Sequence, residues 1–93
     1  MIQSFQHKST KKIYEGERVK EFSIELQEIA RRKLRMLNNS HNLKDLLIPP
    51  SNKLEKLTGN LSGYYSIRVN SQWRIIFKWQ DGHSWNVELI DYH

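Results

Sequence analysis

The sequence has no cysteine, no long apolar run and no glycine-rich loop that could cradle a phosphate. Without cysteine, the chain has neither a disulfide framework nor a zinc site built on thiolates. No apolar stretch approaches the roughly 20 residues that span a bilayer, and the N-terminus is polar from Gln3 onward, unlike a signal peptide. We therefore expect a cytoplasmic protein with no membrane partner. Its 93 residues are expected to form one small domain, residues 1–93.

Positive charge is a clear compositional feature. Fifteen basic and ten acidic residues give a formal net charge of +5, with a sequence pI of about 9.6. A small basic domain favours a polyanionic partner, either a nucleic acid or an acidic protein segment. A merely soluble basic protein is the alternative.

Two helices are predicted in the N-terminal half. The segment 7–16 is typical of a short helix that ends at Gly16, since glycine is favoured just beyond a helix C-terminus. The segment 23–38 has Ser23 as its N-cap and apolar residues at spacings of three and four. Its C-terminal half carries a basic run that forms either a solvated face or a partner-binding surface: Arg31, Arg32, Lys33 and Arg35. Residues 1–5 are predicted as an edge strand or a docking segment.

The segment 41–62 is predicted to be mostly loop. One helical turn is expected at 43–47, and Pro49-Pro50 favours an extended path. Leu54 and Leu57 are expected to hold this segment against the core. The connection therefore leads directly into the C-terminal strands.

The last thirty residues predict a three-stranded antiparallel meander with one buried and one exposed face. One alternating set is almost wholly apolar and is expected to face helix 23–38: Tyr65, Ile67, Val69, Trp73, Ile75, Phe77, Trp79, Trp85, Val87 and Leu89. The other set is mixed and is expected to be exposed: Tyr64, Ser66, Arg68, Arg74, Ile76, Lys78, Asn86, Glu88 and Ile90. The predicted fold class is α+β, with N-terminal helices packed on an antiparallel sheet formed mainly by this meander.

The faces of the meander also fix the strand pairing, because a slip of one residue would invert a strand. Keeping the apolar sides together across a turn at 70–72 sets Arg68 directly opposite Arg74. Two facing arginines are unfavourable unless an anion separates them, and the guanidinium fork suits phosphate oxygens. The pair is therefore a candidate phosphate site. The alternative is two exposed arginines whose stems cover the sheet.

The second turn has two possible registers. Asp81-Gly82 favours a two-residue hairpin, whereas the apolar faces favour a three-residue loop that also includes His83. We prefer the three-residue loop, since the face pattern spans three strands. The preferred register pairs Ile75 with Leu89 and Phe77 with Val87.

The chemistry available is limited to one group of residues. The sequence suggests no Ser–His–acid triad and no paired histidines at metal spacing, so we expect neither metal nor cofactor. The candidate catalytic residues are Arg68, Arg74, Asp91, Tyr92 and His93. Lys53, Lys56 and Lys78 are candidate RNA-binding residues, and Glu55 is a possible base. Such a set suits RNA cleavage without metal, in which a base activates a ribose 2′-OH, arginines stabilise the phosphate and an acid protonates the 5′-oxygen.

Several motifs resemble the HigB toxins of the RelE/ParE toxin–antitoxin superfamily. They are Asn52-Lys-Leu-x-x-Leu-x-Gly59, then Gly63-x-x-Ser-Ile-Arg-Val-Asn-x-x-Trp-Arg-Ile-x-Phe77, and the terminal Asp-Tyr-His. The opening Ile2-x-Ser-Phe5 and the helix end Arg32-Lys-Leu-x-Met-Leu37 also fit. The resemblance therefore covers nearly the whole chain.

The resemblance implies a small α+β fold and a toxin that cleaves mRNA in the A site of the 30S ribosomal subunit, so inhibiting translation. It implies a HigA-type antitoxin with a helix-turn-helix domain. The toxin would contact operator DNA only through this antitoxin. Arg68 and Arg74 match arginines of the family's meander. The C-terminal residues to which the family's catalysis is attributed match Asp91, Tyr92 and His93.

One departure from the family concerns the base. Some relatives carry a catalytic histidine at the place of Glu55, and a lysine where Thr58 stands here. Two other functions compete with mRNA cleavage. A binding poison of the gyrase-directed kind would leave the arginine pair idle, and a plain nucleic-acid-binding module would leave the terminal Asp-Tyr-His unexplained.

Overall fold

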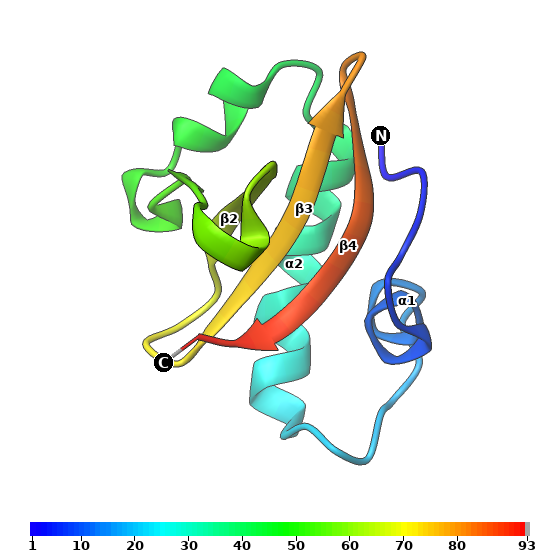
Figure 1. Cartoon of the computed structure of the whole chain (residues 1–93). Coiled ribbons are helices and arrows are strands. Elements are labelled where there is room, and N and C mark those ends of the chain that lie inside the picture. Colours follow the sequence, from blue (N-terminus) through cyan, green and yellow to red (C-terminus); the bar gives the residue numbers. More distant parts are fainter. Residues whose placement is uncertain (93) are drawn as a thin grey trace.

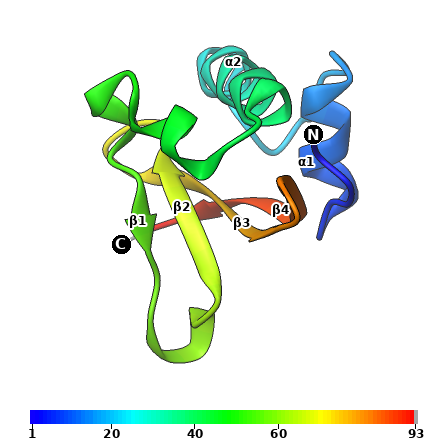
Figure 2. The same cartoon turned by 90° about the horizontal axis from the view of Figure 1, so that it is seen from above.

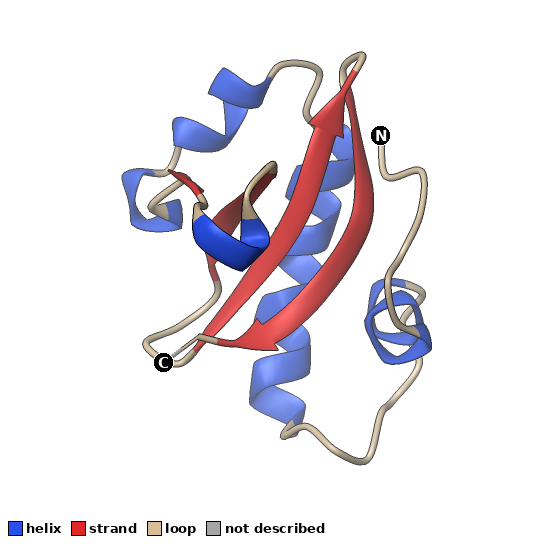
Figure 3. Cartoon of the chain, viewed as in Figure 1, coloured by secondary structure: helices blue, strands red, loops and turns tan. Residues whose placement is uncertain are grey.

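The computed structural model describes residues 1–92, and in that range helices pack on one antiparallel sheet (Figure 1). The helices are α1 (Lys8–Tyr14) and α2 (Ile24–Asn39), with short 3₁₀ helices η1 (Leu43–Leu47), η2 (Pro50–Asn52) and η3 (Gly59–Leu61). The strands are β1 (Glu55–Lys56), β2 (Tyr64–Arg68), β3 (Trp73–Gln80) and β4 (His83–Asp91), paired in the order β1-β2-β3-β4. Figure 3 shows the long strands β3 and β4 crossing over α2. The predicted α+β class is confirmed.

Helix α2 is the element on which the sheet packs. Its N-cap is Ser23, whose hydroxyl accepts a hydrogen bond from the backbone N–H of Leu26 at 3.1 Å. The apolar stripe is buried, as its spacing predicts: Leu26, Ala30, Leu34 and Leu37. Figure 2 shows α2 over one face of the sheet, while no α-helix of residues 1–92 covers the other. We call that other side the open face.

Helix α1 ends as the sequence predicts. Gly16 has a φ of 89°, which glycine adopts without the steric cost of a Cβ. The N–H of Gly16 donates to the carbonyl of Ile13, and the N–H of Glu17 donates to that of Lys12. This pair of bonds is the Schellman motif. Of the helices within residues 1–92, none is both long and apolar enough to pass through a membrane.

Residues 1–6 run parallel to β4 along its outer edge. Ile2 bridges to Ser84, and Phe5 bridges to Val87. The N–H of Gln3 donates to the carbonyl of Ser84 at 2.8 Å. The prediction of an edge or docking segment at the N-terminus is therefore confirmed.

The apolar face of the meander forms the core against α2, largely as predicted. Its most buried members are Ile67, Val69, Ile75, Phe77, Val87 and Leu89. Trp85 is an exception, because 38% of its surface is exposed. It pairs with Lys78, a residue of the exposed set, so its side chain belongs to the open face.

A β-bulge in β4 explains why Trp85 turns outward. Gln80 pairs with His83 around the two-residue turn, so the preferred three-residue loop is wrong. Farther along the strands, Ile75 does pair with Leu89 as predicted. Both pairings hold because β4 has an extra residue. Ile76 pairs with Glu88 and Lys78 pairs with Trp85, so one residue of β3 lies opposite two residues of β4. Asn86 sits in this bulge with a φ of 53°.

Candidate active site

Strand β1 brings Glu55 to the sheet. It pairs with β2 so that Glu55 faces Ser66 and Lys56 faces Tyr65. Alternation along a strand puts Glu55 on the open face and Lys56 on the other side. The prediction that 41–62 is mostly loop misses this short strand, whose two residues alone give no sequence pattern.

Arg74 lies directly opposite Arg68, as predicted, but it is buried rather than exposed. Only 6% of its surface is accessible. Nε of Arg74 donates to the hydroxyl of Ser66 at 2.8 Å, and Nη2 donates to the backbone carbonyl of Lys53 at 2.5 Å. The expectation of an exposed face is therefore wrong at its centre, where Ser66 and Ile76 are buried too. The backbone at Lys53, next to β1, covers this part of the sheet.

The other side of the guanidinium meets two functional groups. Nη1 of Arg74 lies 3.4 Å from Oε1 of Glu55. The ring of Tyr92 lies over the guanidinium, with Cζ of Arg74 5.3 Å from the ring centroid. Tyr92 and the Glu55 side chain are partly exposed, at 39% and 49%. The structure thus brings together Glu55, Arg74 and Tyr92, which we call the Arg74 cluster.

The end of the chain is held by the β2–β3 turn. The N–H of Tyr92 donates to the carbonyl of Gln72 at 2.7 Å, and Nε2 of Gln72 donates to Oδ2 of Asp91 at 3.0 Å. Asp91 pairs with Trp73, so strand alternation puts its side chain opposite to that of Tyr92. His93 lies outside the described residues.

Arg68 adds a second positive charge, which acts on Lys33 of α2. It is half-buried. Burial, then the neighbouring charges of Arg32 and Arg68, lower the pKa of Lys33. Nζ of Lys33 donates to Oδ1 of Asn52 at 2.6 Å. From the sequence, Lys33 is predicted only as part of the basic run of the helix. Its contact with Asn52 was not predictable, because that contact depends on how η2 packs.

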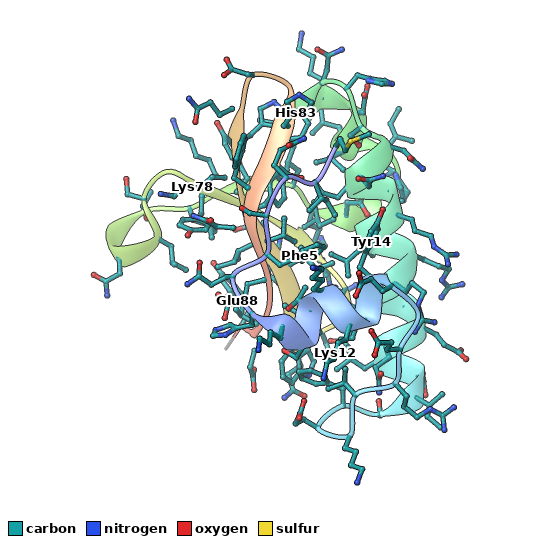
Figure 4. All side chains as sticks on the ribbon, turned by 90° about the vertical axis from the view of Figure 1, so that its right-hand side faces the viewer. Phe5, Lys12, Tyr14, Lys78, His83 and Glu88 are labelled. Atoms are coloured by element: carbon teal, nitrogen blue, oxygen red, sulfur yellow. The ribbon has the colours of Figure 1, made fainter. Side chains whose placement is uncertain are left out.

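The three candidate RNA-binding lysines are all exposed, but they lie in different places. Lys53 adjoins the Arg74 cluster through its backbone, whereas Lys56 is on the far side of β1. Lys78 is on the open face, with Nζ 5.2 Å from the ring centroid of Tyr64. Figure 4 shows Lys78 and Glu88 on the side of the sheet away from α2.

The arrangement suits chemistry at a phosphate. A guanidinium that is fixed by Ser66 and Lys53 presents a positive charge that needs no reorganisation when an anion arrives. The carboxylate of Glu55 can accept a proton, and the exposed ring of Tyr92 can contact a base or a phosphate. Ser66 is the residue that sequence reasoning missed, since a serine on a polar face gave no sign of a buried arginine partner.

Comparison with known proteins identifies the family of this chain. A family model described as RelE-like toxin of type II toxin-antitoxin system HigB matches residues 3–93. The chain is 52% identical over 58 residues to Toxin HigB-1 of Vibrio cholerae, a match that spans 62% of this chain and 61% of that protein. It is 30% identical over 95 residues to Endoribonuclease HigB of Proteus vulgaris, with 100% of both chains covered.

Solved structures share the fold at lower identity. A YafQ variant from E. coli superposes with a TM-score of 0.66 at 18% identity, over 98% of this chain and 93% of that one. The YoeB–YefM toxin–antitoxin complex from Staphylococcus aureus gives 0.62 at 22%, over 100% and 98%. The chain belongs to the HigB-like toxins, the RelE-like toxins of type II toxin–antitoxin systems.

Proposed function

We propose that this chain is a ribosome-dependent mRNA endonuclease that inhibits translation without a metal ion. The observation that carries the proposal is the Arg74 guanidinium, fixed by Ser66 and Lys53, with Nη1 beside Glu55 and the ring of Tyr92 above it. A preorganised cation complements the negative charge that develops on a phosphate during cleavage, and the carboxylate beside it can accept a proton. The name of the Proteus relative, Endoribonuclease HigB, supports the same reaction.

In the proposed reaction, a ribose 2′-oxygen attacks the adjacent phosphorus and the bond to the 5′-oxygen breaks. Glu55 takes the 2′-hydroxyl proton, while Arg68 and Arg74 stabilise the negative charge on the phosphate oxygens. The proton for the leaving 5′-oxygen comes from Tyr92 or His93, whereas Asp91, whose side chain lies opposite to that of Tyr92, holds the C-terminal segment through Gln72. The products are a 2′,3′-cyclic phosphate on one fragment and a 5′-hydroxyl on the other.

The ribosome supplies substrate positioning in this proposal. The Arg74 cluster lies on an open sheet face, with Glu55 and Tyr92 partly exposed. Such a surface does not by itself hold a flexible RNA in the in-line geometry that the reaction needs, and correct orientation contributes a large share of a rate enhancement. We therefore propose that the mRNA is cut when the 30S A site presents it, with Lys53, Lys56 and Lys78 contacting RNA.

The proposed protein partner is a HigA-type antitoxin with a helix-turn-helix domain, which carries the toxin to operator DNA. Family membership and the toxin–antitoxin complex of the Staphylococcus neighbour support an antitoxin. Residues 1–6 already cover the edge of β4, which favours the basic surface of α2 over that edge as the contact. Arg32 and Arg35 are exposed on α2 and suit an acidic segment. We propose that residues 1–93 act as one cytoplasmic toxin domain.

The test is primer extension on an mRNA that is being translated in a cell extract. We expect wild-type toxin and the Lys12→Gln control, exposed on α1, to give new ends within codons. We expect Arg68→Gln, Tyr92→Ala and a deletion of His93 to weaken these ends. Cleavage that persists undiminished in all three variants would remove these residues from the mechanism.

The competing functions give different results in the same extract. Inhibited gyrase with intact mRNA would support a binding poison. RNA retention without cleavage, with a steep dependence on salt, would support a plain nucleic-acid-binding module. Either result would reject the endonuclease proposal.

A further inference from the structure

A second group of residues lies on the open face, away from the Arg74 cluster. Tyr64, Lys78 and Trp85 are neighbours across β2, β3 and β4, because Tyr64 pairs with Lys78 and Lys78 pairs with Trp85. We call them the Trp85 row. Lys78 is exposed and Tyr64 is partly exposed. One cation thus lies between two aromatic side chains on an accessible surface.

The outward position of Trp85 depends on the bulge at Asn86. Without the extra residue, alternation from the buried Val87 would also turn Trp85 into the core. Instead, Asn86 adopts a φ of 53°, a conformation that a non-glycine residue adopts at an energetic cost. Bulges commonly re-aim a side chain next to a functional site. The bulge at Asn86 therefore exposes a large aromatic ring.

The row is also held in a defined arrangement. Nε1 of Trp85 donates to the backbone carbonyl of Gln80 at 3.4 Å. Nζ of Lys78 lies 5.2 Å from the Tyr64 ring centroid, within the range of a cation–π contact. An aromatic ring for base stacking beside a cation for the phosphate is the combination that single-stranded nucleic acids bind.

The row lies on the same side of the sheet as the Arg74 cluster, farther along β3. Lys78 is four residues from Arg74 on the same face, which corresponds to about 13 Å at ~3.3 Å per residue. Between them lie the buried Ile76 and, opposite it on β4, Glu88. The side chain of Glu88 is 22% exposed, and its Oε2 lies 3.0 Å from Nε2 of His7. A protonated His7 offsets the negative charge of Glu88. An RNA strand that contacts both groups must therefore pass over Ile76 and beside Glu88.

We propose that the Trp85 row is a subsite for a nucleotide of single-stranded mRNA that flanks the cleaved phosphate. Its base stacks on Trp85, with Tyr64 beside it, and its phosphate contacts Lys78. This inference rests on the proposed mRNA cleavage and extends it, because it adds a contact distant from the reacting bond. The row would select for an unpaired, unstacked base at that position.

The first measurement is the affinity of the toxin for ribosomes that carry an mRNA with a 2′-O-methyl group at the attacking ribose. This substrate binds but cannot be cut. We expect Trp85→Ala to weaken binding by roughly 5- to 150-fold and Trp85→Phe to restore most of it. Ile48→Ala is the matched control, because Ile48 is 75% exposed in the segment before η2. Equal affinities for wild type and Trp85→Ala would overturn the subsite.

A second measurement separates stacking from a structural effect of the substitution. Abasic nucleotides are placed one at a time on either side of the cleavage site. We expect one abasic position to abolish the difference between wild type and Trp85→Ala, since the stacked base is then missing. A difference that persists at every abasic position would show that Trp85 acts through folding, and would overturn the proposal.

Salt dependence tests the role of Lys78 in the same complexes. We expect Lys78→Gln to reduce the slope of log affinity against log salt by about 0.7 to 1, as for one lost phosphate contact. An unchanged slope would reject that contact. A wild-type toxin that neither binds nor cuts ribosome-bound mRNA would instead reject the proposed function itself, so the two failures are distinguishable.

Discussion

Oε1 of Glu55 lies 3.4 Å from Nη1 of Arg74, although the two residues are 19 positions apart in the sequence. The contact exists because β1 pairs with β2 and sets Glu55 opposite Ser66, whose hydroxyl also binds Arg74. The carboxylate is half exposed, whereas the arginine is buried. A phosphate that reaches Nη1 therefore lies close to Glu55, which places a proton acceptor beside the phosphate-binding group.

Replacing Glu55 tests its proposed role as the base. We expect Glu55→Gln to slow mRNA cleavage by about 10²- to 10⁴-fold, the usual contribution of a positioned acid or base. The free energy of unfolding should change by less than about 1 kcal/mol, because Glu55 is half exposed and a glutamine oxygen can still accept a hydrogen bond from Arg74. Single-turnover cleavage and urea unfolding measure the two quantities.

Glu21→Gln is the matched control for this substitution, since Glu21 is exposed in the loop before α2. We expect it to leave the cleavage rate unchanged. An unchanged or faster rate in Glu55→Gln would show that Glu55 only neutralises Arg74, and the base would then lie among the C-terminal residues.

The two facing arginines should differ in their effect on stability. Arg74→Ala is expected to lower the free energy of unfolding by about 2–4 kcal/mol, because it leaves the buried Ser66 hydroxyl and the Lys53 carbonyl without their donor. Arg68→Ala is expected to change it by about 0.5 kcal/mol or less. Removing Arg68 also relieves its repulsion of Lys33. Urea unfolding of both variants measures the difference, and equal losses would contradict the packing described for Arg74.

Most of the framework could be predicted from the sequence, because the elements carry local signals. A few residues suffice to predict the apolar stripe of α2, its Ser23 cap and the end of α1 at Gly16. The facing of Arg68 and Arg74 followed from the two-residue period of the strands. Each of these features depends on residue type or spacing within a short segment.

The site itself needed three-dimensional information. Strand β1 is too short to give a pattern, so the contact between Glu55 and Arg74 was not predictable. The burial of Arg74 depends on a backbone carbonyl from Lys53, which leaves no mark in side-chain patterning. In β4, two valid signals disagreed about the turn, and the bulge at Asn86 satisfied both of them.

The bulge gives a test of its own through Asn86. We expect Asn86→Val to lower the free energy of unfolding by about 1–3 kcal/mol, because a β-branched residue fits poorly at positive φ. It also removes the side-chain oxygen that accepts from the Ser4 hydroxyl at 3.3 Å. Asn86→Gly is the partner variant and should stay within about 1 kcal/mol of wild type. If the valine variant were as stable as the glycine variant, the bulge would not be at this residue.

Asp45 should make stability depend on acid pH. Hydrogen bonds from the backbone N–H groups of Asn42 and His41 lower the pKa of its carboxyl below the usual value. A lowered pKa in the folded state stabilises the protein above the unfolded-state pKa, and this contribution is lost as pH falls through the folded value.

We therefore expect Asp45→Asn to be less stable than wild type at pH 7, by an amount that shrinks as pH falls below about 4. Urea midpoints at pH 7 and in steps down to acid pH measure this trend. A difference that stays constant over the whole range would mean that the charge of Asp45 does not contribute.

The most direct test of the central claim is single-turnover cleavage on purified ribosomes, with analysis of the RNA ends. One mRNA is supplied free in solution or with its codon in the A site. We expect cleavage on the ribosome at least about 100-fold faster than in solution, fragments with 5′-hydroxyl ends, and a loss of about 10²- to 10³-fold in Arg68→Gln. Intact mRNA at toxin concentrations that stop translation, or fragments with 5′-phosphate ends, would contradict the proposed function of the Arg74 cluster.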